Sequence, residues 1–328
     1  MIHARWTGCL ALSLLPLSGC ASLQVKLGAK TPLANLPVTS IQASLANGKG
    51  IAPGQKSPLV VTLSEPNGKV WRTEGAGNGK IMWRDLNVTA TVAKVNGKGV
   101  LSLPKDPRLS DRKVPHVTIT APSHPDLHAD LDIPVRYDRK YAVDFSGSTG
   151  ANGTNGSDGL NGIAGSPGSI DLTNPSPGGK GSDGGDGSDG GDGQRGGNAT
   201  PVNIRVAFRQ GTPPLLQIGV SAASRETFFL VDLVGGSLTV KADGGSGGSG
   251  GKGGSGGHGG SGGVGWPSGL DGANGHDGRN GSDGSPGSGG LITVTYDSEA
   301  KPFLSAIKLS IWNGPAPIYK EGSAPPLW

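Results

Sequence analysis

The sequence predicts a mainly β protein whose strands are interrupted by long stretches of regularly spaced glycine. Gly accounts for 61 of the 328 residues, more than twice its usual share. Hydrophobic residues make up 34% and aromatic residues 5%, so one hydrophobic core cannot hold the whole chain. The remaining sequence contains short alternating or apolar runs that end in turn residues, which is typical of β strands.

Residues 1–19 have the layout of a secretory signal peptide. A positive start is followed by an apolar run from Cys9 to Leu17, which is too short to remain in a bilayer as a spanning helix. The next residues, Leu17-Ser18-Gly19-Cys20, resemble the lipobox of bacterial lipoproteins. This resemblance implies cleavage before Cys20, acyl chains on that residue and a firm membrane anchor. The alternative is an ordinary signal peptide in which Cys20 occurs by chance.

The residues after Cys20 bear on the membrane that would receive the protein. Ala21 and Ser22 follow, with no Asp directly after the cysteine, and this resembles enterobacterial lipoproteins that are sent to the outer membrane. We expect residues 20–37 to form the lipidated cysteine and a spacer. Cys9 and Cys20 are the two cysteines of the chain, so the mature protein is predicted to lack an intrachain disulfide.

Residues 38–145 are expected to form a β-sandwich. Strands are predicted at 59–63, 87–92, 117–120, 127–133 and 141–143, and the second of these leads to the hairpin signal Asn96-Gly97. In its pattern of strands the segment resembles a bacterial immunoglobulin-like domain.

Gly repeats fill residues 146–198 and 244–290. Gly occupies every third position from Gly147 to Gly168 and from Gly178 to Gly196. Residues 244–265 repeat Gly-Gly-X, and Gly-X-Y returns from Gly269 to Gly287. Strands are predicted on either side, within 199–243 and 291–328, at 202–209, 228–234, 238–242, 291–296 and 307–311. Because one strand ends at Ala242 and the next starts at Leu291, we expect 244–290 to be inserted between two strands of one sheet.

A three-residue period is compatible with three arrangements. A collagen-like trimer requires Gly at every third position but is also expected to be rich in Pro, which is scarce here. A bundle of polyglycine-II helices within one chain uses bare Gly faces for close backbone contact, with Gly-Gly-X inside and Gly-X-Y at the edges. A flexible linker does not need an unbroken register. We favour the intrachain bundle, which resembles glycine-rich regions of some phage adhesins and small antifreeze proteins.

Candidate binding residues are few. Asp183, Asp186, Asp189 and Asp192 recur every third residue and are weak candidates for calcium, with Asp271, Asn274, Asp277, Asn280 and Asp283 forming a second ridge. His124 and His128, near Asp130, are weak candidates for another metal, although a solvated sheet face has the same pattern. Trp266, at the break between two repeats, is expected either to contact a glycan or another surface, or to close the end of the bundle.

These features predict a lipid-anchored protein of the outer membrane with a structural or adhesive role, at the cell surface or in the periplasm. Its partners would be the membrane, through Cys20, and other surface proteins or glycans. A module for glycans or divalent ions and a collagen-like trimeric stalk are the alternatives. We expect no cofactor and no enzymatic activity, since no nucleophile elbow, P-loop or dinucleotide fingerprint is present. The net charge of +4, without a basic stripe, gives no support to nucleic-acid binding.

Overall fold

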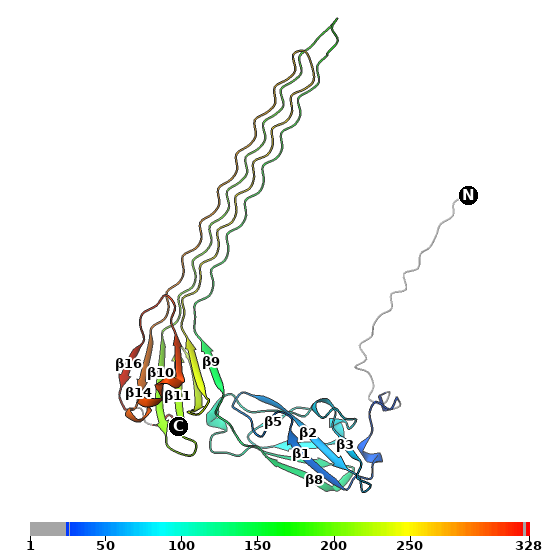
Figure 1. The fold of residues 1–328 in the computed structure, drawn as a ribbon, viewed down its shortest axis with the longest axis vertical. Coiled ribbons are helices and arrows are strands. Elements are labelled where there is room, and N and C mark those ends of the chain that lie inside the picture. The colour runs from blue at the N-terminus through cyan, green and yellow to red at the C-terminus, as the bar shows by residue number, and fades with distance from the viewer. Residues whose placement is uncertain (1–23, 26, 324–325) are drawn as a thin grey trace, which may run out of the picture. The chain divides into compact units, whose positions relative to one another are not determined.

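A computed structural model describes residues 24–25, 27–323 and 326–328. The chain is mainly β and divides into two compact units, Met1–Arg136 and Tyr137–Trp328 (Figure 1). The predicted signal peptide and Cys20 lie outside the described residues.

Unit 1 contains two sheets that share one core, which is consistent with the predicted β-sandwich. One sheet has the order β1-β2-β6-β5 with β3 also paired to β2, and the other has the order β4-β7-β8. The first comprises β1 (Ser40–Leu45), β2 (Lys56–Ser64), β3 (Val70–Arg72), β5 (Lys94–Val95) and β6 (Val100–Ser102). The second comprises β4 (Asn87–Ala90), β7 (His116–Ala121) and β8 (His124–Asp132). Alternate residues face one shared core, such as Val61 and Leu63 of β2 with Val117 and Ile119 of β7.

Short 3-10 helices occupy the connections of unit 1. They are η1 (Leu33–Asn35), η2 (Gly75–Gly77), η3 (Trp83–Asp85) and η4 (Pro107–Leu109). The predicted Asn-Gly turn lies between β5 and β6, where the Asn96 side chain accepts hydrogen bonds from the N–H groups of Lys98 and Val100.

Unit 2 is built from two sheets of orders β12-β11-β10-β14-β16 and β15-β13-β9. The larger sheet comprises β10 (Val202–Arg209), β11 (Leu215–Ala222), β12 (Arg225–Asp232), β14 (Ile292–Tyr296) and β16 (Ile318–Glu321). The smaller comprises β9 (Lys140–Asp144), β13 (Ser237–Lys241) and β15 (Ile307–Ser310), and the 3-10 helix η5 (Ser298–Ala306) precedes β15. Residues from both sheets, among them Ile204, Ile218 and Val240, form one core.

The chain crosses from the smaller to the larger sheet three times, from β9 to β10, from β13 to β14 and from β15 to β16. Strands of successive crossings pair in parallel within each sheet. The first two crossings are the Gly-rich residues 146–198 and 244–290, whereas the third is the short loop 311–317. In that loop, Asn313 donates a side-chain hydrogen bond to the Gly287 carbonyl at 2.7 Å, which ties the loop to the base of the second crossing.

Two expectations about these connections were wrong. The strands on either side of 244–290, β13 and β14, lie in different sheets rather than in one. Residues 141–143, expected to end the amino-terminal sandwich, belong to β9, which pairs with β13 in unit 2. In both cases alternation identified the strand, but alternation does not specify which strand becomes its partner.

The Gly-rich residues form four extended segments that run side by side away from the sheets of unit 2 (Figure 1). We call them segment A (146–168), segment B (178–198), segment C (244–265) and segment D (269–288). They adopt neither α-helix nor β-strand. A turn at 169–177 joins A to B, and a turn at 266–268 joins C to D.

Candidate functional site

Backbone hydrogen bonds join the four segments at every third residue. Around Gly251 of segment C, its N–H donates to the Gly191 carbonyl of segment B at 2.9 Å, and its carbonyl accepts from Gly281 N–H of segment D at 2.8 Å. Gly153 of segment A donates to the Ser249 carbonyl of segment C at 2.8 Å. The same pattern repeats along the segments, so that B and C bond to all three others, whereas A and D bond to B and C.

Glycine is required where the backbones meet. A Cβ at Gly251 would overlap the carbonyl oxygen of Thr154, and one at Gly250 would overlap that of Gly281. The third residue of each triplet, such as Ser249 or Lys252, is exposed. Each Gly-Gly-X triplet therefore uses two positions for close backbone contact and one for a side chain that points to solvent.

Asp and Asn side chains form a second ladder across the segments, in which Oδ1 accepts a backbone N–H. Side chains of segment A accept from backbone N–H groups of segment C, at 2.8 to 3.0 Å, and these acceptors are Asn152, Asn155, Asp158 and Asn161. Side chains of segment D also accept from segment C, at 2.7 to 2.9 Å, and these acceptors are Asp271, Asn274, Asp277, Asn280 and Asp283. Side chains of segment B accept from backbone N–H groups of segment D, at 2.7 to 2.9 Å, and these acceptors are Asp183, Asp186, Asp189, Asp192 and Asn198.

The two ladders together satisfy all three N–H groups of a triplet in segment C. Gly254 donates to the Ser188 carbonyl at 2.9 Å, Ser255 to Asp158 Oδ1 at 2.8 Å, and Gly256 to Asp277 Oδ1 at 2.8 Å. Backbone donors that approach one another this closely need such partners, because a buried N–H without one is destabilising. The Asp and Asn residues are thus structural acceptors, a role that the sequence analysis did not assign to them.

The sequence separation of the bonded residues gives the direction of each segment. Side-chain bonds from A to C join residues 97 apart throughout, and those from B to D join residues 90 apart. Constant separation means that these pairs run parallel. Between C and D the separation falls from 33 to 9 toward the turn at 266–268, so these two segments form an antiparallel hairpin.

The carboxylates proposed for calcium each have one oxygen engaged in this way. Asp183 accepts from Ala273 N–H at 2.8 Å, and this bond, with the nearby Lys180 ammonium, lowers the pKa of Asp183. Asp186, Asp189 and Asp192 repeat the arrangement with successive residues of segment D. Among the described residues, no group of three or more His, Cys, Asp or Glu side chains is placed to hold a metal ion.

The two candidate histidines lie at different places along β8. His124 has its Nε2 at 2.9 Å from the Leu36 carbonyl oxygen and its Nδ1 at 2.9 Å from Ser123 Oγ. His128 is exposed, with Nε2 at 3.7 Å from Asp130 Oδ2. The structure therefore places the two rings with separate neighbours.

His116 of β7 is the histidine that contacts two carboxylates. Its Nδ1 lies 2.7 Å from Asp132 Oδ1, and its Nε2 lies 3.1 Å from Asp130 Oδ1. The hydrogen bond with Asp132 is the main reason that the pKa of His116 is raised. The pKa of Asp130 is lowered, chiefly by a hydrogen bond from Thr118 Oγ1 at 2.7 Å. These side chains lie on the exposed face of the sheet and join β7 to β8.

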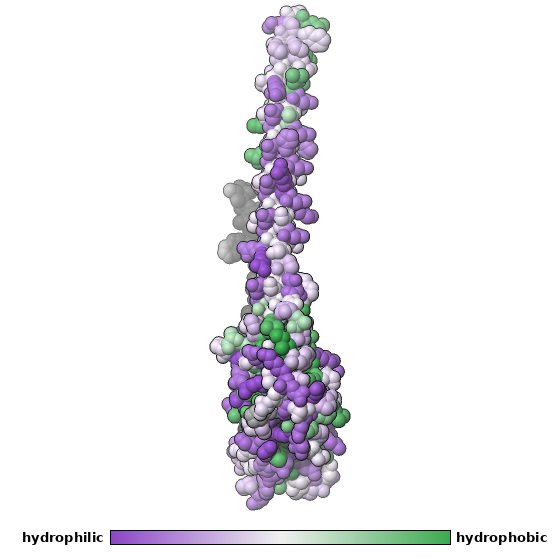
Figure 2. Space-filling view, turned by 90° about the vertical axis from the view of Figure 1, so that its left-hand side faces the viewer, coloured by the Kyte–Doolittle hydropathy of each residue, from purple (hydrophilic) through white to green (hydrophobic). Residues whose placement is uncertain are grey.

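The turns at the far end of the segments carry exposed apolar side chains. Trp266 is 72% exposed, and it is the Trp266 backbone N–H, rather than its ring, that bonds to the Ser176 carbonyl of the neighbouring turn, at 2.9 Å. Leu172 of that turn is 95% exposed. Figure 2 shows hydrophobic residues at this end, above a surface that is mostly hydrophilic along the segments. Trp266 is thus mostly exposed to solvent.

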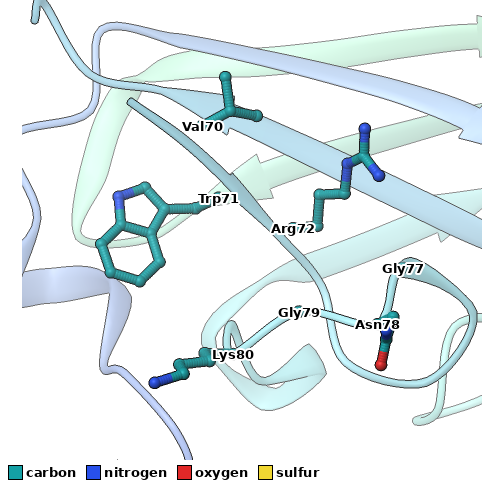
Figure 3. Close-up of a pocket in the computed structure, with 7 residues that line it drawn as sticks. All are labelled: Val70, Trp71, Arg72, Gly77, Asn78, Gly79 and Lys80. Carbon is teal, nitrogen blue, oxygen red and sulfur yellow. The ribbon is translucent and has the colours of Figure 1, made fainter. Parts of the chain in front are cut away.

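Unit 1 has an open hollow of about 460 Å3 beside β3 (Figure 3). It is lined by Val70, Trp71, Arg72, Gly77, Asn78, Gly79 and Lys80. The Trp71 indole N–H donates to Glu65 Oε1 at 2.6 Å, and the Lys69 ammonium lies 4.1 Å from the ring centroid. Trp71 and Arg72 point apart in Figure 3, as successive strand residues do. The hollow has no convergent set of polar groups, and no sequence motif marks it.

No family model matches the chain, and no curated protein matches it. Within the part of the chain that the structure describes, none of the helices has the length and apolar character needed to cross a bilayer. The function must therefore be argued from the segments and their turns.

Proposed function

We propose that the protein is a lipid-anchored stalk protein of the bacterial outer membrane with a structural or adhesive role. In this proposal segments A to D form a bundle of polyglycine-II helices within one chain, which we call the stalk. The observation that carries it is the double ladder of backbone bonds and Asp or Asn bonds that links all four segments. A flexible linker does not require such a repeating set of partners.

The number of Gly residues per triplet supports a bundle in which segments B and C are central and segments A and D lie at its edges. Segments B and C each bond to three others, and C has two Gly in every triplet. Segments A and D bond to two others and carry one obligatory Gly per triplet. At about 3.1 Å per residue, Gly147 to Gly168 would span roughly 65 Å. A stalk of this length would hold its turns well away from the sheets at its base.

The same contacts argue against the collagen-like trimer. A trimer needs the Gly face of each segment for two other chains. Here the space beside Gly147 through Gly165 is filled by carbonyl groups of segment B from the same chain. A collagen-like assembly would therefore require the four segments to separate.

The anchor and the location rest on the sequence. Leu17-Ser18-Gly19-Cys20 resembles a lipobox, and Ala21 and Ser22 resemble the residues of outer-membrane lipoproteins. In this proposal, unit 1, the sandwich with an immunoglobulin-like pattern, separates the stalk-bearing unit from the lipid on Cys20.

A binding module for glycans is the second candidate function, and the exposure of Trp266 is the observation that favours it. A glycan array with Trp266→Ala as the comparison separates it from a purely structural role. Divalent-ion binding along the Asp ridge has less support, since each carboxylate already accepts a backbone N–H.

Two measurements test the proposal. Light scattering after size exclusion gives the solution mass of residues 21–328, for which we expect a monomer, and a trimer would contradict the intrachain bundle. Membrane fractionation of cells that express the full chain tests the anchor. We expect Cys20→Ser to move the protein out of the outer-membrane fraction, and unchanged fractionation would contradict anchoring through Cys20.

A further inference from the structure

The far end of the stalk carries a group of large apolar side chains that the fold does not bury. Their exposed fractions lie between 65% and 95%. We call this group the apolar tip: Ile163, Ile170, Leu172, Val264, Trp266 and Leu270. Single exposed apolar residues are ordinary on protein surfaces, but a group of this size concentrated at one end marks an interaction site.

The turns that carry the apolar tip are held by backbone hydrogen bonds. Ser169 and Ser176 exchange N–H to carbonyl bonds at 3.2 and 3.0 Å, and Trp266 donates to the same Ser176 carbonyl. Gly168 donates to the Val264 carbonyl at 2.6 Å. The apolar side chains are therefore displayed on defined turns, and these bonds also reduce the number of backbone groups that an apolar environment would leave without a partner.

The apolar tip is almost free of charge. Between residues 159 and 179 and between residues 259 and 270, Asp171 is the one charged side chain. Its Oδ1 accepts bonds from the Thr173 N–H and hydroxyl at 2.9 and 2.7 Å. Charged residues resume directly below, with Lys180 on segment B and Asp271 on segment D. This gives a sharp boundary between an apolar end and a charged shaft.

We propose that the apolar tip inserts into the surface of a lipid bilayer, with Ile170, Leu172 and Trp266 as the leading side chains. The near absence of charge does not suit a partner recognised by complementary charge, such as an acidic or basic macromolecule. The apolar side chains project from two turns, and this arrangement favours contact with a deformable lipid layer over insertion into a preformed pocket of another macromolecule. Trp is favoured at the boundary between hydrocarbon and water, and Leu and Ile are favoured deeper. Asp171 would limit insertion to the interfacial layer.

This inference rests on the proposed function only in using the stalk to display the apolar tip. It does not depend on lipid at Cys20, so it is tested on residues 21–328, which contain every described residue and lack that cysteine. The probe is a vesicle of phosphatidylcholine, which has no net charge. Co-flotation with these vesicles measures binding, and we expect the protein to float with them equally at low and high salt.

The test variant is the triple substitution Ile170→Ser, Leu172→Ser and Trp266→Ser. Each large apolar side chain is worth roughly tenfold or more in partitioning, so the triple variant is expected to bind at least about 1000-fold less. The matched control is Leu109→Ser, Val234→Ser and Trp312→Ser, which removes side chains that are 54% to 78% exposed at other places. The control is expected to float like the unchanged protein, and an unchanged melting temperature shows that both variants fold.

A second readout locates the inserted residue. Phosphatidylcholine with brominated acyl chains is expected to quench part of the tryptophan fluorescence, and Trp266→Phe should abolish this quenching while the protein still floats. The inference is overturned if the protein does not float, if the tip variant floats like the control, or if binding needs anionic lipid and disappears at high salt. The proposed function fails separately, through a trimeric solution mass, whatever the vesicles show.

Discussion

Gly254 lies in the middle of segment C, where three other segments contact its backbone. Its N–H donates to the Ser188 carbonyl of segment B, and its carbonyl accepts from Gly278 N–H of segment D. A Cβ at this position would overlap the Ser157 carbonyl oxygen of segment A. In Gly254→Ala the added methyl group would therefore force segments A and C apart.

The expected cost follows from the bonds near the methyl group. Separation would weaken the bonds that join A to C here, from Gly156 N–H, Gly159 N–H and Ser255 N–H, each worth about 1 kcal/mol. The same substitution reduces the conformational entropy of the unfolded chain, and this raises the free energy of unfolding by about 0.4–1 kcal/mol. The net loss in the free energy of unfolding is about 2 kcal/mol. For a unit of this size, this lowers the melting temperature by roughly 4–8 °C.

Calorimetry of residues 21–328 measures this change as a shift of the transition that belongs to unit 2. Ser255→Ala, one residue away in the same triplet, is the matched control because its side chain is exposed, and its melting temperature should change by about 1 °C or less. If Gly254→Ala is as stable as Ser255→Ala, or more stable, segments A and C are not in the contact described.

Three further outcomes are expected. Asp277→Ala removes the acceptor of Gly256 N–H and should destabilise unit 2 by about 1 kcal/mol, whereas Asp277→Asn keeps an acceptor and should have little effect. If chemical denaturation shows the same loss of stability for both variants, Asp277 is not the acceptor described. The raised pKa of His116 gives unit 1 stability that is fully present below the ordinary value of 6.5 and is lost as pH rises through the folded pKa. In NMR titration Asp132→Asn should lower the His116 pKa, and an unchanged value would contradict the described ion pair. Calcium or a chelator should leave the melting temperature unchanged, because the Asp ridge is engaged with backbone N–H groups, and a calcium-dependent shift would show that the ridge binds the ion.

Strands in which apolar and polar residues alternate could be predicted from the sequence. Residues 202–206 alternate apolar and polar side chains, and the strand predicted over 202–209 forms β10 with the same bounds. Leu215–Ala222, by contrast, was missed because nearly all of it is buried and it carries no alternation, with Gly219 in its middle. A strand that is covered on both faces lacks the period that reveals a half-exposed one.

The three-residue period indicated close backbone contact but could not identify the partners. The A-to-C and B-to-D pairs join residues 97 and 90 apart, and no local signal in the sequence specifies these distances. The Asp and Asn residues illustrate the same limit. Their spacing suggested an exposed ridge, and only the position of the neighbouring segment makes each one an acceptor for a backbone N–H. The exposure of Trp266 likewise depends on how the two turns meet at the far end.

Amide hydrogen exchange of the glycines tests the central claim most directly, because the claim is that the Gly-rich segments are held by hydrogen bonds within one chain. With glycine labelled by nitrogen-15, NMR reports exchange at Gly251, Gly254 and Gly257, whose N–H groups donate to segment B. The account predicts that these amides are strongly protected in a monomeric sample, while Gly97, in the turn between β5 and β6 of unit 1, exchanges quickly. Exchange of the segment glycines at the rate of an unstructured chain, or protection that appears only in a trimer, would contradict it.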